Sequence, residues 1–213
     1  MALVTMVGAS VALTGQSYAA VKTGRGSAYG FYAKVSLFGG PAKTRGPAPK
    51  VKLPAGGSTV AITASAASES AQYGPATVYS SGQTDISTQG KKTVTTSTDI
   101  FSVSAGPFTA DEVTSTCQLF HLGLSGSATT SNGVLVTSTD ANGNPVTTVN
   151  IPANPPPNDT YSGTIDNIGD SFTYVFNEQV TNANGSISVN AGHEYLLGPT
   201  AVGDLIFGQS SCG

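Results

Sequence analysis

The stretch from Phe172 to Asn190, FTYVFNEQVTNANGSISVN, places two β-rich arms on either side of an Asn184-Gly185 pair. In both arms, residues with high β-propensity alternate with small polar residues, which is the period-2 pattern of half-buried strands. Asn-Gly favours a type I′ turn, because both residues tolerate a positive φ and the twist of this turn matches paired strands. The stretch therefore predicts a β-hairpin.

The same period recurs along the chain. Residues 134–151, VLVTSTDANGNPVTTVNI, predict a second hairpin around Asn142-Gly143. The segment Thr109–Glu112 fits a helical capping box, but the β-branched residues after it favour a turn into a strand. Residues 39–57 and 151–159 are dense in Pro and Gly, so we expect loops there.

The composition agrees with a β-protein. Only 10% of the 213 residues are charged, Ser and Thr supply about a quarter of the chain, and there are 26 Gly, 12 Pro and no Trp. Few straight-chain residues are present to favour long helices, and a net charge of -3 disfavours disorder. We predict a single-domain, antiparallel β-sandwich over residues 20–213, with Greek-key or jelly-roll character and about ten strands.

Residues 1–19 read as a signal peptide that is cut after Ala19, because small residues occupy the positions before that bond. No Lys or Arg precedes the apolar run. We therefore expect either that the true start lies upstream of Met1 or that the sequence begins inside the apolar core of the leader. Export favours a structural disulfide between the two cysteines, Cys117 and Cys212. No other segment predicts a membrane span.

The charges are divided along the sequence. Nine bases and two acids lie at or before Lys92, whereas ten acids and no base follow it. Strands that interleave in space would mix the two signs. Alternatively, the loop from Lys43 to Lys52 forms a basic finger, in which Lys43, Arg45, Lys50 and Lys52 contact an anionic cell-envelope polymer, a surface protein or the acidic half of a second copy.

Catalytic patterns are weak. We interpret His121 and His193 as structural histidines, since His193-Glu194 lacks the second histidine of a zinc motif and no nucleophile elbow is present. The run from Asp140 to Asn144 begins like a calcium loop, but a hairpin turn explains it equally well. We expect no enzymatic activity, no metal, no cofactor and no nucleic-acid partner.

Several short motifs occur in a familiar order. They are Ser27-Ala28-Tyr29-Gly30, the segment from Thr109 to Cys117, Val189–His193, Gly203–Gly208 and a closing Cys212. This order resembles the bacterial choice-of-anchor P family of exported surface proteins. The resemblance implies a surface or secreted domain of unassigned biochemistry and suggests that Cys117 and Cys212 are the family's cysteine pair. The chain departs from the pattern in lacking an anchor and in having Gly192 before the histidine, where an apolar residue is expected.

The sequence therefore predicts a secreted, non-enzymatic protein of structural or interaction type, associated with the cell envelope. Its oligomeric state is left open. The alternative is a carbohydrate-binding module or adhesin that uses exposed tyrosines such as Tyr29, Tyr32, Tyr73 and Tyr79. A secreted hydrolase is a remote third reading, for which Asp166 and Asp170 are carboxylate candidates only by elimination.

Overall fold

The computed structural model describes the backbone of residues 24–73, 76–88, 93–121 and 123–213, and their side chains outside 67–88. The predicted signal peptide, residues 1–19, lies outside the described residues. Thirteen strands account for most of this backbone. They are β1 (Gly26–Leu37), β2 (Lys43–Lys52), β3 (Ile62–Tyr73), β4 (Ala76–Thr88), β5 (Thr93–Ala105), β6 (Phe108–Phe120), β7 (Gly123–Ser131), β8 (Val134–Thr139), β9 (Pro145–Asn150), β10 (Asp159–Ile165), β11 (Asp170–Thr181), β12 (Ile187–Leu197) and β13 (Ala201–Cys212).

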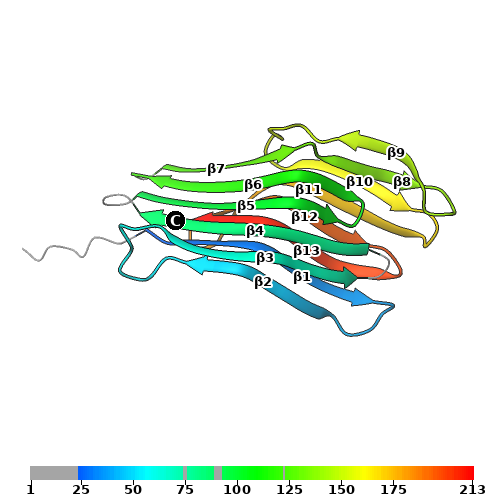
Figure 1. Cartoon of the computed structure of the whole chain (residues 1–213), viewed down its shortest axis with the longest axis horizontal. Helices are drawn as coiled ribbons and strands as arrows, with labels where there is room; N and C mark the ends of the chain where they lie inside the picture. Colours follow the sequence, from blue (N-terminus) through cyan, green and yellow to red (C-terminus); the bar gives the residue numbers. More distant parts are fainter. Residues whose placement is uncertain (1–23, 74–75, 89–92, 122) are drawn as a thin grey trace, which may run out of the picture.

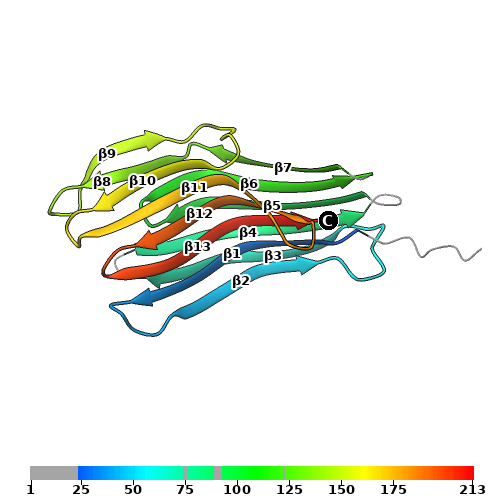
Figure 2. The ribbon, with the colours of Figure 1, turned by 180° about the vertical axis from the view of Figure 1, so that it is seen from behind.

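All thirteen strands belong to one mixed sheet, in the order β2-β1-β13-β12-β11-β10-β8-β6-β5-β4-β3, with β7 beside β6 and β9 beside β8. The sheet curls so that two arms lie face to face (Figures 1 and 2). The first arm contains β2, β1, β13, β12, β11 and β10, and the second arm contains β3 to β7. The arms are joined through β8, which pairs antiparallel with β6 and parallel with β10.

The all-β class and the disulfide are confirmed. The expected sandwich of two separate sheets with Greek-key connections is not confirmed, because the described strands form one continuous sheet and most neighbours are hairpin partners. The strand predicted after Thr109–Glu112 is confirmed within β6, but the turn predicted at Thr109–Glu112 is wrong, because these residues already belong to the strand. The predicted loop at residues 39–57 is wrong over Lys43–Lys52, which forms β2. Proline is tolerated there because β2 ends the sheet order and pairs only with β1.

Both predicted hairpins are confirmed, but their turn type is not I′. Only the glycine of each Asn-Gly pair has a positive φ, 83° at Gly143 and 80° at Gly185. Each glycine N–H donates to the carbonyl three residues earlier, Asp140 and Asn182, over 2.9 Å. This geometry is a type I turn followed by a left-handed glycine. Asp140 Oδ1 also accepts the backbone N–H groups of Asn142 and Asn144, so the turn itself uses this carboxylate.

The core lies between the two arms. Phe108 from the second arm packs against Phe176 and Phe207 of the first arm, with ring centroids 4.9 and 5.4 Å apart. All three rings are fully buried. Burial of one such ring contributes roughly 1.5–3 kcal/mol, so this aromatic cluster is a main support of the face-to-face packing.

One row of residues breaks the in–out alternation of the first arm. On each of four neighbouring strands, one residue lies between two positions that are matched in register but is not itself matched. These residues are Gly30, Gly208, Ala191 and Asn177. Gly208 and Asn177 have positive φ angles of 65° and 49°. Within one strand, core residues on the two sides of this row are an odd number of positions apart, as Ala28 and Phe31 are. Regular alternation would give an even number. At this row, each of the four strands therefore exchanges the face that points to the core; we say that the strands turn over here.

Gly192 follows this row and faces the core. A Cβ at residue 192 would overlap the ring of Phe207, so no larger side chain fits without movement of the aromatic cluster. This contact gives a physical reason for glycine where the family resemblance implies an apolar residue.

We expect Gly192→Ala to lower the free energy of unfolding by about 1–3 kcal/mol, the usual cost of overpacking a core. Urea unfolding followed by tyrosine fluorescence measures this change. Gly56→Ala is the matched control, because Gly56 has no positive φ and no atom within 4 Å of an added Cβ. Equal stability of the two variants would contradict the prediction.

Candidate functional site

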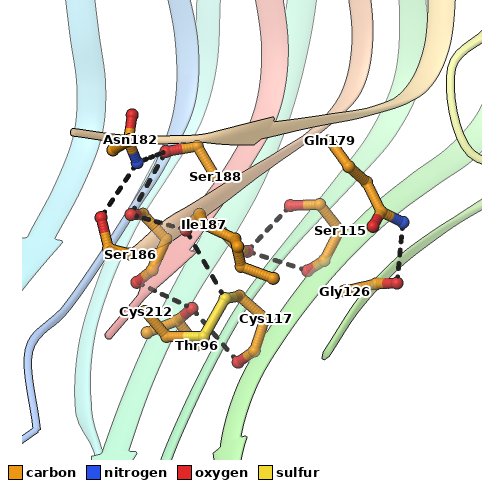
Figure 3. Close-up of a disulfide and its surroundings, with 12 residues drawn as sticks. Thr96, Ser115, Cys117, Gly126, Gln179, Asn182, Ser186, Ile187, Ser188 and Cys212 are labelled. Carbon is orange, nitrogen blue, oxygen red and sulfur yellow. Dashed lines mark hydrogen bonds between the residues drawn. A yellow bond between two sulfur atoms is a disulfide. The ribbon is translucent and has the colours of Figure 1, made fainter. Parts of the chain in front are cut away.

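The two cysteines join the arms at one end of the molecule. Cys117 on β6 and Cys212 on β13 form a disulfide with a Cα–Cα distance of 5.7 Å, and both are buried (Figure 3). Nearby, the Ser115 and Ser210 hydroxyl oxygens lie 2.8 Å apart across the same interface. The bridge is therefore part of the packing between the arms, which agrees with the structural role predicted for it.

The four predicted basic contacts all lie on β2 and are exposed, but they form two pairs. Lys50 and Lys52 stand opposite Tyr29 and Ser27 of β1, and Lys43 and Arg45 stand opposite Val35 and Ala33. Opposed residues of antiparallel strands share a face of the sheet. Val35 and Ala33 are core residues, whereas Tyr29 and Ser27 alternate with the core residue Ala28. The two pairs thus occupy opposite faces and opposite ends of β2.

The division of charge along the sequence persists in space. Every described Lys or Arg side chain belongs to β1, to β2 or to Arg25 just before β1. The described acids lie on other strands and loops. Among them, Asp204 of β13 is paired in register with a residue of β1, which is Lys34. One edge of the first arm is consequently basic, and the neighbouring strands β12 and β11 carry carboxylates.

The face of the first arm that points away from the second arm carries a row of polar side chains. The register aligns five of them across five strands: Lys50 of β2, Tyr29 of β1, Gln209 of β13, Asn190 of β12 and Glu178 of β11. Four more polar residues of this face lie beyond the row where the strands turn over, and they are Tyr32, His193, Asp204 and Tyr195. We call these nine residues the outer polar face.

Glu178 is the centre of this face. One of its carboxylate oxygens, Oε2, accepts a hydrogen bond from Asn190 Nδ2 at 2.6 Å and lies 2.7 Å from His193 Nδ1. The other oxygen accepts the Tyr195 hydroxyl at 2.6 Å. Burial raises the pKa of Glu178, but these three partners outweigh it and hold the pKa below its ordinary value.

The network continues from Glu178 in two directions. Gln209 Nε2 donates to Asn190 Oδ1 at 2.8 Å, and Gln209 stands opposite Tyr29 in the register of β1 and β13. On the other side, His193 Nε2 lies 3.4 Å from Asp204 Oδ1. Burial raises the pKa of Tyr29, and burial followed by the bond to Glu178 raises that of Tyr195, so both hydroxyls stay protonated near neutral pH.

The two histidines differ from each other. His193 is buried in the network, which supports its structural reading. His121 is exposed in the turn after β6, with a φ of 58°, so the predicted packed position for His121 is wrong. The apolar sequence around it, LFHLG, continues a strand only as far as Phe120. In the part of the chain that the structure describes, no three His, Cys, Asp or Glu side chains gather as metal ligands.

Two of the four tyrosines proposed for sugar contact come together. Tyr29 and Tyr32 are half-buried on the outer polar face, with ring centroids 6.4 Å apart in an edge-to-face arrangement. Tyr195, which the sequence analysis did not single out, stacks on His193 with centroids 3.9 Å apart. The side chains of Tyr73 and Tyr79 lie outside the described residues.

The chain matches no family model, no curated protein and no solved structure. Among the described residues, no helix has the length and hydrophobicity needed to cross a membrane.

Proposed function

We propose that this chain is an exported, non-enzymatic protein that associates with the cell envelope by contacting an anionic partner along β2. The observation that carries the proposal is the spatial segregation of the bases. The side chains of Lys43, Arg45, Lys50 and Lys52 are all exposed on the strand that ends the sheet order. A terminal strand whose exposed charges, on both of its faces, have one sign attracts polymers of the opposite sign.

Three further features support this reading. A buried disulfide that joins distant parts of a chain is typical of proteins that mature in an oxidising compartment. The family resemblance also implies an exported surface protein without assigned chemistry. The network around Glu178 is buried and internally bonded, which fits a scaffold for binding better than a reaction centre.

The test replaces Lys43, Arg45, Lys50 and Lys52 together with serine. Because contacts between exposed charges are screened by salt, the natural protein is expected on the cell envelope and is released by molar salt. The variant is expected in the medium, with envelope retention at least ten-fold lower. Fractionation of the producing cells and immunodetection of the mature chain measure both.

Two kinds of variant serve as controls. The triple variant Lys43→Arg, Lys50→Arg and Lys52→Arg keeps the charge and is expected to stay on the envelope. The double variants Lys43→Ser/Arg45→Ser and Lys50→Ser/Lys52→Ser assign the contact to one face of β2, because the structure separates these pairs. Unchanged retention of the fourfold serine variant would refute the proposal.

A further inference from the structure

We infer that the outer polar face is a binding site for an extended polysaccharide that carries both acidic and neutral sugars. The inference rests on the proposed function, because Lys50 of β2 is one of the nine residues of this face and Lys52 extends the same strand. It deepens that function by naming the chemical class of the anionic partner.

The first argument is the fixed orientation of the polar groups. Gln209, Asn190 and Glu178 follow one another in register across three strands and are hydrogen-bonded to each other at 2.8 and 2.6 Å. Asn190 and Glu178 are buried, so they fix the position of the half-buried Gln209, and a ligand does not pay to order that amide on binding. Sugar hydroxyls both donate and accept hydrogen bonds, which matches a face built from amides, carboxylates and phenols.

The second argument is the presence of aromatic rings among these groups. Tyr29, Tyr32 and Tyr195 are neither fully buried nor fully exposed, so each combines a fixed position with surface that a ligand can cover. A tyrosine ring offers an apolar face to the C–H side of a sugar and a hydroxyl at its rim. The outer polar face therefore offers aromatic rings as well as polar groups.

The third argument is the gradient of charge across the strands. Lys50 and Lys52 lie at the β2 edge and Lys34 lies on β1, whereas Asp204 and the buried Glu178 lie on β13 and β11. A ligand with an anionic group at every unit would meet carboxylates as well as lysines and be repelled in part. A chain that alternates acidic and neutral sugars can place its carboxylates at the lysines and its hydroxyls at the carboxylates. This pattern favours an acidic polysaccharide over a nucleic acid or polyphosphate.

The experiment titrates the full chain by calorimetry with three probes: hyaluronan, in which acidic and neutral sugars alternate, neutral dextran, and polyphosphate. Hyaluronan is expected to bind most tightly. The Lys50→Ser/Lys52→Ser variant should weaken its binding by about ten-fold and reduce the salt dependence. Gln209→Ala should weaken it by about three- to ten-fold, the value of one hydrogen bond, and Tyr32→Ala by about ten-fold.

Gln118→Ala is the matched control, because Gln118 is an exposed glutamine on β6 of the second arm. It should leave the affinity unchanged, and thermal unfolding verifies that each variant remains folded. Three results would overturn the inference: no binding of hyaluronan, polyphosphate binding that equals it while Gln209→Ala and Tyr32→Ala have no effect, or a second copy of the chain covering this face in solution. The fourfold serine variant can lose envelope retention while the natural chain does not bind hyaluronan. That result would leave the proposed function standing and would remove only this inference.

Discussion

Replacing Cys117 and Cys212 together with alanine is expected to lower the free energy of unfolding by about 4–5 kcal/mol. The two cysteines are 95 residues apart in sequence, and a cross-link that closes a loop of this length removes much of the freedom of the unfolded chain. The bridge also lies between β6 and β13, so its loss weakens the contact between the two arms.

Urea unfolding at neutral pH measures the effect, and a reductant supplies the internal control. Reductant should destabilise the natural chain to about the level of the double variant and should not change the variant itself. A destabilisation below about 1 kcal/mol would show that the packing of the arms holds without the cross-link.

The second large effect concerns Glu194, a carboxyl group that is 1% exposed in the core. Its Oε1 has no hydrogen-bond partner in the described residues, and the hydroxyl proton of its neighbour Tyr174 is donated to the Ala105 carbonyl at 2.5 Å. Burial, which outweighs the opposing effect of Tyr174, raises the pKa of Glu194 to about 8. The neutral acid is therefore the form that the fold accommodates.

The direction of the pH dependence follows from this shift. Unfolded Glu194 ionises near pH 4.5 and folded Glu194 near pH 8, so the unfolded state loses its proton first. The contribution of this group to stability is full below pH 4.5, declines by about 1.4 kcal/mol per pH unit between the two values, and is lost above pH 8.

Glu194→Gln should remove this decline and make the protein more stable than the natural chain at pH 9. Urea midpoints between pH 4 and pH 9 test the prediction. Asp166→Asn serves as the control, since Asp166 is exposed and its replacement should leave the slope unchanged. A natural chain that is equally stable at pH 5 and pH 9 would refute the assignment to Glu194.

Local patterns predicted much of the fold. The two Asn-Gly hairpins and the strand character of β6 follow from residues that are close in sequence, and the disulfide follows from there being only two cysteines. The strand β2 was missed because Pro47, Pro49 and their neighbouring glycines are typical of loops, and only its position at the end of the sheet makes them acceptable.

The outer polar face could not be assembled from the sequence, because its residues come from strands whose pairing is non-local. The register that places Tyr29 beside Gln209 joins β1 to β13, and no local pattern specifies that pairing. One signal was available. Asn177, Glu178 and Gln179 are three consecutive polar residues inside a strand, and such an interruption of alternation marks the level at which the strands turn over.

The position of the disulfide has a consequence for how the molecule carries mechanical force. Gly26 of β1 stands opposite Cys212 of β13, so tension applied at these two points pulls the strands apart one pair at a time from that end. The load then passes from Cys212 directly into Cys117 through the covalent bridge. Because the bridge closes residues 118–211 into a loop, an oxidised molecule pulled at these two points lengthens along its covalent chain only through the part that precedes Cys117.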